Sequence, residues 1–278
     1  MGGLSKKAAF ISAVQAKSDV PTLLLDAGNQ LFKQQTLPPA TGEAEAAKIK
    51  AQGVVTANQK MGLRYAAVGM HDLAAGPGFL HSLAEDNFTW LSLNLRDRHS
   101  NQALFPGYTI IQVGKLPVAV LALTNHRGNF AGSNAPYHLL PWQEVLPAAL
   151  TQLRPQAGML ILLSNYPLAE NREIARLYPQ VDLIFQSGQN IGNLAPIAGS
   201  RTLISQTAIR GRYLGLLEID WRGPGPWRQP GKGALPKKGQ PGSSFSQRFI
   251  PLTAAMADDP ATGELIRQVE KQAQAALR

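Results

Sequence analysis

Short apolar runs alternate with stretches of helical periodicity along most of this chain, and this alternation constrains the fold more than any other feature. The apolar runs predict strands at residues 21–28, 65–69, 88–95, 107–124 (a hairpin that turns at 113–117), 158–164, 181–187, 201–207, 211–220 and 247–252. The periodic stretches predict helices at residues 43–62, 72–86 (interrupted), 142–153, 168–178 and 258–278. Strands that alternate with helices are typical of an α/β fold whose central strands run mostly parallel.

Polar residues and glycines follow several of the predicted strands. They are Asp26 to Asn29, Gly69 to Asp72, Asn94, Ser164 to Asn165, and Ser187 to Asn190. Ligands of open α/β sheets bind beyond the carboxyl ends of the strands, so these positions are candidate site residues. Turns from a strand into a helix also need Gly, Asn, Asp and Ser for caps and for positive φ. This structural interpretation stays open beside the functional one.

The bulk properties exclude several classes of protein. The chain of 278 residues is long enough for one large domain or two small ones, and no apolar run reaches the ~18 residues that would span a membrane. Its first residues lack the sustained apolar core of a secretory signal, so we expect no signal peptide within the chain, and the compartment stays open. Because cysteine is absent, disulfides, thiolate nucleophiles and cysteine-bound zinc are excluded.

The chain is basic, with a formal net charge of +9. The positive residues are scattered, and aromatic residues do not interleave with them as they would on a stacking platform for nucleic acid. We therefore interpret the charge as a solubility feature and expect no dedicated nucleic-acid site. A scaffold that attracts polyanions through general electrostatics stays open as an alternative.

Residues 222–246 are rich in proline, glycine and basic side chains and cannot bury enough apolar surface to fold alone. Predicted strands precede and follow them. We therefore interpret them as a long mobile hairpin loop inside a single domain that spans residues 1–278.

The order of several short motifs carries a family resemblance that no single motif carries alone. In chain order they are GGLSKKAAFI, TLLLDAGNQLF, MGLRYAAVGMHDLAAG, LSLNL, VAVLALT, LILLSN, VDLIFQSGQN, IRGRYLGLLEID, and FIPL followed by DDP. The set resembles the metallophosphatase domain of bacterial 5′-nucleotidases and UDP-sugar hydrolases, in the calcineurin-like phosphoesterase superfamily. The resemblance covers nearly the whole chain. It implies a four-layer αββα sandwich and a dinuclear metal site that generates a hydroxide nucleophile.

The resemblance also implies where the metal ligands would stand, and this chain departs from the family at each of these positions. Asn29 replaces the aspartate of the G-D motif, and Met70 replaces the asparagine of G-N-H-D. Asn165 stands at the position of a lone histidine, and Gln189 and Ile191 stand at the two histidines of G-H-x-H. The D-x-H motif of the family's first strand is not found, so we expect the sandwich to lack that strand if no upstream segment supplies it.

His71 and Asp72 match the His-Asp pair of the family, in which the histidine protonates the leaving-group oxygen and the aspartate orients the ring. Without metals, a lone general acid supplies about 10²–10⁴ of rate, far below the demand of phosphoester hydrolysis. The structural alternative makes Asp72 the N-cap of helix 72–86. It makes His71 a partly buried ring bonded to a neighbouring segment.

Four further residues are candidates to line a cleft at this edge. His126 and Arg127 follow the hairpin 107–124, and the other two are Asn94 and Asn190. Their amide and basic groups suit a neutral or anionic ligand.

These departures lead to three hypotheses. In the first, the chain is a 5′-nucleotidase-like domain that has lost its dinuclear metal site and needs no cofactor. It then binds a small anionic ligand or another protein, with little or no catalysis. In the second, it is an active phosphoester hydrolase with a divergent site for divalent metal ions. In the third, it is the basic scaffold for polyanions. Whether the chain is an enzyme stays open, and the resemblance implies only that such domains are usually extracytoplasmic.

Overall fold

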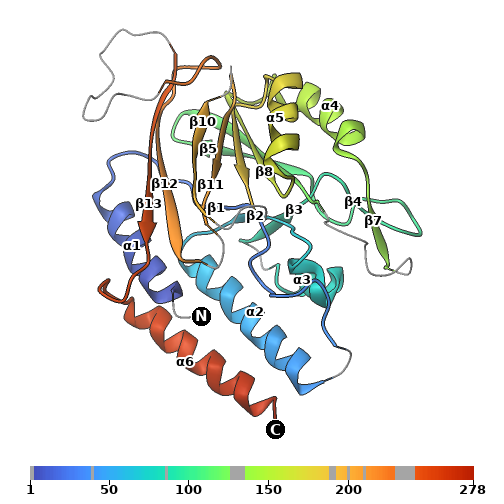
Figure 1. Ribbon diagram of the computed structural model, residues 1–278, viewed down its shortest axis with the longest axis vertical. Helices are drawn as coiled ribbons and strands as arrows, with labels where there is room; N and C mark the ends of the chain where they lie inside the picture. Colours follow the sequence, from blue (N-terminus) through green and yellow to red (C-terminus); the bar gives the residue numbers. More distant parts are fainter. Residues whose placement is uncertain are drawn as a thin grey trace.

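The structure is a computed structural model that describes residues 3–38, 41–84, 87–125, 135–187, 192–198, 201–208, 211–228 and 242–278. Two layers of strands lie between two layers of helices (Figure 1). One outer layer contains α1 (Leu4–Lys17), α2 (Gly42–Lys60) and α6 (Pro260–Ala275), and the other contains α4 (Trp142–Leu153) and α5 (Leu168–Leu177). The predicted αββα sandwich is confirmed.

One strand layer is a six-stranded sheet. Its order is β10 (Leu194–Ala198), β11 (Leu203–Gln206), β9 (Leu183–Gln186), β8 (Met159–Ser164), β6 (Leu116–Leu123) and β5 (Tyr108–Val113). The four central strands are parallel, as predicted, and both edge strands pair antiparallel to them. All of β8 and most of β6 are buried, because α4 and α5 cover one face of the sheet and the second strand layer covers the other.

The second strand layer contains two separate groups of strands. The parallel strands β1 (Leu25–Asp26), β2 (Tyr65–Ala67) and β3 (Thr89–Leu91) form one group, and the hairpin β12 (Tyr213–Asp220) and β13 (Ser244–Pro251) forms the other. Both groups pack against the six-stranded sheet through one apolar cluster. Within the described residues no ladder joins the two groups. That the layer lacks a strand stays a prediction.

The segments that follow β2 and β3 contain only short elements of secondary structure. The predicted interrupted helix 72–86 is a 3₁₀ turn, η1 (Asp72–Ala75), followed by α3 (Pro77–Ser82), because Gly76 has a φ of 84° and breaks the helix before Pro77. After β3, β4 (Leu95–Asp97) pairs antiparallel with β7 (Tyr137–Leu139) in a sheet of two strands.

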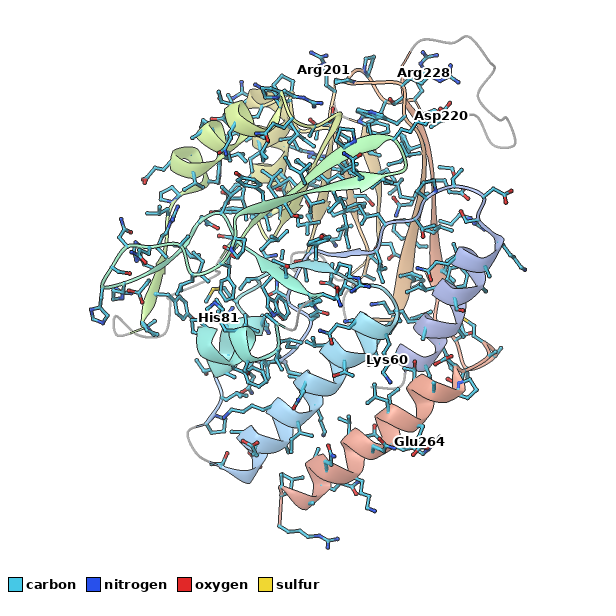
Figure 2. The ribbon with its side chains drawn as sticks, turned by 180° about the vertical axis from the view of Figure 1, so that it is seen from behind. Lys60, His81, Arg201, Asp220, Arg228 and Glu264 are labelled. Atoms are coloured by element: carbon cyan, nitrogen blue, oxygen red, sulfur yellow. The ribbon has the colours of Figure 1, made fainter. Side chains whose placement is uncertain are left out.

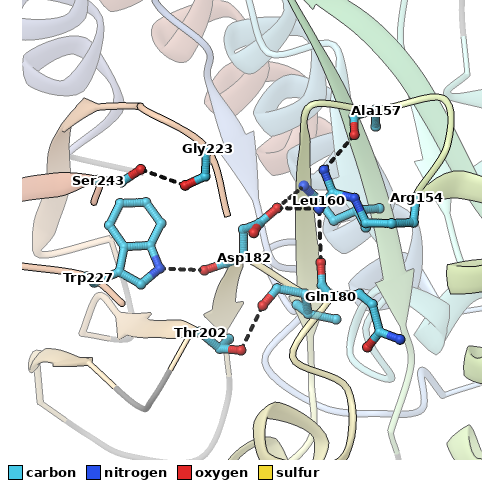
Figure 3. Close-up of polar contacts among 10 residues, drawn as sticks. Arg154, Ala157, Leu160, Gln180, Asp182, Thr202, Gly223, Trp227 and Ser243 are labelled. Carbon is cyan, nitrogen blue, oxygen red and sulfur yellow. Dashed lines mark hydrogen bonds and ion pairs between the residues drawn. The ribbon is translucent and has the colours of Figure 1, made fainter. Parts of the chain in front are cut away.

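The segment predicted as a mobile loop, residues 222–246, is partly fixed to the sheets. Its last three residues belong to β13, and residues 229–241 lie outside the described part. Trp227 is 6% exposed and donates its Nε1–H to the carbonyl of Asp182 at 2.9 Å (Figure 3). The loop prediction is therefore wrong for residues 244–246, and Trp227 is held in the core because its ring packs against Phe245.

Charged side chains are distributed over the molecule. Seen from behind, Arg201, Asp220 and Arg228 lie at one end, while Lys60 and Glu264 lie on the layer that contains α2 and α6 (Figure 2).

In the part of the chain that is described, no helix combines the length and apolar character needed to cross a bilayer.

Candidate functional site

The predicted site positions lie where the chain leaves the carboxyl ends of the strands. Asn29 follows β1, and Met70, His71 and Asp72 follow β2. Asn165 follows β8 directly. Five further candidates fall outside the described residues: His126, Arg127, Gln189, Asn190 and Ile191.

Asn165 is tied to the end of β1 by hydrogen bonds. Its side-chain Nδ2 donates to the carbonyl of Ala27 at 2.5 Å and to the Oγ of Ser187 at 3.0 Å. The Ser187 hydroxyl in turn donates to the same Ala27 carbonyl at 2.7 Å. A carbonyl only accepts hydrogen bonds, so the side-chain nitrogen of Asn165 must point toward it. The bridging role of Ser187 was not predicted, although its place at a strand end was.

Asn29 joins the same network from the other side. Its Nδ2 lies 3.4 Å from the Ser187 Oγ, and its Oδ1 accepts from the backbone N–H of His71 at 3.1 Å. The backbone of Asn29 has a φ of 64°, in the left-handed region that asparagine tolerates. Gly69 is needed beside it, because a Cβ there would overlap the Asn29 side-chain oxygen.

Asp72 fastens the loop that carries Asn29. Its Oδ2 accepts from the N–H groups of Asn29 at 2.7 Å and Gly69 at 2.8 Å. Its Oδ1 accepts from the N–H groups of Gln30 at 2.8 Å and Leu31 at 3.0 Å. The prediction that Asp72 is the N-cap of helix 72–86 is wrong, because Asp72 begins the 3₁₀ turn and its carboxylate caps a distant loop instead. Burial raises the pKa of Asp72 to about 7, and the N–H donors limit that rise.

His71 is half-buried and bonded to a neighbouring segment, as the structural alternative predicted. Its Nδ1 lies 3.1 Å from the carbonyl of Phe32, so Nδ1 carries the proton and donates. The neutral ring then presents Nε2 as an acceptor, and only a doubly protonated ring could donate from Nε2. Both oxygens of Asp72 serve backbone N–H groups, so Phe32 rather than Asp72 orients this ring. Whether His71 or Asp72 takes part in catalysis stays a prediction.

Two predicted positions point into the protein interior. Met70 is 4% exposed and belongs to the apolar cluster that contains Val68, Leu73 and Phe88, so its thioether is part of the core. Asn94 is 0% exposed and does not line a cleft, which corrects the prediction. Its Oδ1 accepts from the N–H of Thr124 at 2.9 Å, and its Nδ2 donates to the carbonyls of Thr124 at 2.8 Å and Leu140 at 3.0 Å.

The described groups at this edge do not fit a pair of divalent cations. Metal sites of this kind need carboxylates and imidazoles, and the described residues hold no group of three or more His, Asp or Glu side chains that could bind a metal ion. The Asn165 amide presents its N–H hydrogens to Ala27 and Ser187, and N–H hydrogens repel a cation. Within the described residues, the edge combines amide, hydroxyl and carbonyl groups with the carboxylate of Asp72, whose oxygens accept from backbone N–H groups.

Known proteins are similar to this chain in structure. No family model matches the chain, and no curated protein matches it. Among solved structures, the Thermus thermophilus sulfate thiohydrolase SoxB in complex with glycerol is 17% identical, with a TM-score of 0.77 over 98% of this chain and 47% of its own. A 5′-nucleotidase precursor, also from Thermus thermophilus, is 20% identical, with a TM-score of 0.72 over 98% of this chain and 53% of its own. The calcineurin-like phosphoesterase YfkN from Bacillus subtilis is 12% identical, with a TM-score of 0.73 over 99% of this chain and 90% of its own.

The chain has the calcineurin-like phosphoesterase fold. The resemblance predicted from the motif order is confirmed at the level of the fold. The chain spans about half the length of the first two of these proteins. At these identities the likeness concerns the fold alone, so the calcineurin-like phosphoesterase fold by itself assigns no substrate.

Proposed function

We propose that this chain is a 5′-nucleotidase-like domain that has lost its dinuclear metal site and works as a ligand-binding or partner-binding domain with little or no catalysis. The observation that carries the proposal is the contact of the Asn165 side-chain nitrogen with the Ala27 carbonyl at 2.5 Å. It puts a hydrogen-bond donor where the resemblance would put an imidazole ligand. The same neutral chemistry recurs at Asn29, where the resemblance would put a carboxylate.

Metal content and hydrolysis test this proposal together. The purified chain is loaded with Mn²⁺ or Zn²⁺, desalted and subjected to elemental analysis, and is then assayed with p-nitrophenyl phosphate and a nucleoside 5′-monophosphate. We expect no stoichiometric metal and no turnover that depends on metal. Hydrolysis that a chelator abolishes and Mn²⁺ restores would overturn the proposal in favour of an active hydrolase with a divergent site.

A matched variant tests the assignment of the positions. Asn29→Asp combined with Asn165→His supplies one carboxylate and one imidazole at the edge, and both are ligands that divalent cations prefer. We expect this variant to retain more Mn²⁺ than the wild type. Equal Mn²⁺ retention by the variant and the wild type would show that these two positions do not form a metal-binding site. We leave Met70 unchanged in this variant because an amide at that buried position would lie in the apolar core.

A further inference from the structure

The two-stranded sheet of β4 and β7 holds an arginine that forms no ion pair with any carboxylate of the described residues. Arg96 lies on β4 and is half-buried. Its Nη2 makes one long contact, 3.5 Å, to the carbonyl of Leu93. Its Nε is buried and has no hydrogen-bond partner within the described part of the chain. A buried N–H donor without a partner is costly, and an anion that accepts from this Nε would remove the cost.

The neighbours of Arg96 show that this is not a general property of the strand. Arg98, two residues along, donates from Nε to the carbonyl of Ala135 at 2.6 Å and from Nη2 to the carbonyl of Tyr137 at 3.1 Å. The carboxylate of Asp97 points to the opposite face, because side chains alternate along a strand. It accepts from the N–H groups of His99 at 3.0 Å and Ser100 at 2.8 Å. The nearest acid in the sequence is therefore already used within its own turn.

The strand register places a second basic group beside Arg96. His138 on β7 is its direct cross-strand partner, and Ala103 bridges to Arg96 on the other side. Side chains of directly opposed residues share a face, with Cβ atoms roughly 5 Å apart. Ala103 is small and exposed, so its side chain adds neither a charge nor a hydrogen-bonding group on that face.

We propose that Arg96 and His138 form a binding site for a tetrahedral oxyanion, of which the phosphate group of a phosphomonoester is the probe class. The planar guanidinium offers two parallel N–H donors to such an anion, and the imidazole offers a third. This site uses β4 and β7 rather than the network of Asn29 and Asn165. The inference therefore goes beyond the proposed function and holds whether or not the chain hydrolyses phosphoesters.

Binding of inorganic phosphate tests the site. Titration of the ¹⁵N-labelled chain at physiological ionic strength should show saturable shifts of backbone amides in β4 and β7. Arg96→Gln removes the charge and keeps much of the stem, and we expect it to weaken phosphate binding at least about 10-fold. Arg96→Lys keeps the charge but lacks the planar guanidinium, so its phosphate affinity should lie between those of the wild type and Arg96→Gln. Arg172→Gln on the exposed surface of α5 loses the same net charge and should bind as the wild type does.

Three results would overturn the proposal. The first is the absence of saturable shifts in the wild type, and the second is shifts confined to residues outside β4 and β7. The third is equal weakening by Arg96→Gln and Arg172→Gln, which would indicate general attraction of anions by a basic chain. If Arg96→Gln fails to fold, the wild-type shift map and His138→Gln still decide, since loss of binding in His138→Gln supports the site and unchanged binding contradicts it. The metal and hydrolysis assays above are independent of all these outcomes.

Discussion

Replacing Asn94 by alanine tests whether this residue joins segments of the fold or lines a cleft. In the structure its amide satisfies the N–H and carbonyl of Thr124 and the carbonyl of Leu140. The site is fully buried, so Asn94→Ala leaves three backbone groups without their partner. Each such group costs about 1–3 kcal/mol, and water that enters the vacated space satisfies some of them. We therefore expect a loss of about 3–5 kcal/mol in the free energy of unfolding.

Urea unfolding followed by circular dichroism, together with thermal melting, measures this loss. For a chain of this length about 1 kcal/mol corresponds to about 2 °C, so the melting temperature should fall by about 6–10 °C. Asn87→Ala is the matched control, because Asn87 is exposed and its side chain makes no hydrogen bond within the described part of the chain. This control should stay within about 0.5 kcal/mol of the wild type. If Asn94→Ala is no less stable than the control, the amide does not hold these segments together, and its interpretation as a cleft residue returns.

Three further substitutions test other contacts. Burial raises the pKa of Asp72 from 3.8 to about 7, so its contribution to stability is complete below pH ~4 and is lost as the pH rises through ~7. The wild type should lose stability over this range in urea titrations, and Asp72→Asn should lack this loss; parallel curves would contradict the linkage. Trp227→Phe keeps the aromatic packing but removes the donor to the Asp182 carbonyl, and should cost about 1–2 kcal/mol by urea unfolding; an unchanged midpoint would mean that the hydrogen bond contributes nothing. Arg154→Met removes the cation 2.9 Å from the Asp182 carboxylate, which is 1% exposed (Figure 3). Arg154→Met should lower the free energy of unfolding by about 3 kcal/mol, and adding Asp182→Asn should recover part of that loss. If nothing is recovered, the loss comes from packing of the Arg154 side chain rather than from the unpaired carboxylate.

Sequence patterns predicted best the elements in which the spacing of apolar residues matches the faces that are buried in the structure. The strand β8 is apolar along nearly its whole length because both of its faces are buried, and the hairpin of β5 and β6 turns where predicted. By contrast, α1 was not predicted. Its buried positions are Ser5, Ala8 and Ile11, and two of these three side chains are too small or too polar to mark a periodic face.

The short strands β7 and β10 were also not predicted, because tertiary pairing rather than local sequence makes them strands. The strand β7 has three residues and depends on its pairing with β4. The strand β10 carries Pro196 and pairs with β11 through an irregular register. The intrinsic strand propensity of such segments is low, and they form strands only because they pair with a neighbouring strand.

At the candidate site, sequence patterns predicted where residues lie better than they predicted what their side chains do. Strand ends predicted the place of Asn29, His71, Asp72 and Asn165 at one edge. The roles of Asn29, Asp72 and Asn165 were not predictable from spacing, because the groups that decide them come from elsewhere in the chain. Asp72 looked like a helix cap since a turn follows it, yet three of its four donors are backbone N–H groups about forty residues earlier. The burial of Asn94 likewise depends on Thr124 and Leu140, which no local pattern connects to it.

The hydrogen bonds at the edge bear on whether a metal site can be introduced there. The resemblance puts the family's metal ligands in the loops that follow β1, β2, β8 and β9. In this chain Asn165 and Ser187 link the loop after β1 to those after β8 and β9, and Asp72 links it to the loop after β2. A histidine introduced at Asn165 would remove the Nδ2 donor and leave the Ala27 carbonyl with the Ser187 hydroxyl alone among these groups. Because the positions share partners, their effects on metal affinity should not add. We therefore expect Asn165→His alone to lower stability without a gain in Mn²⁺ binding, and any gain to appear only when Asn29→Asp supplies a negative charge.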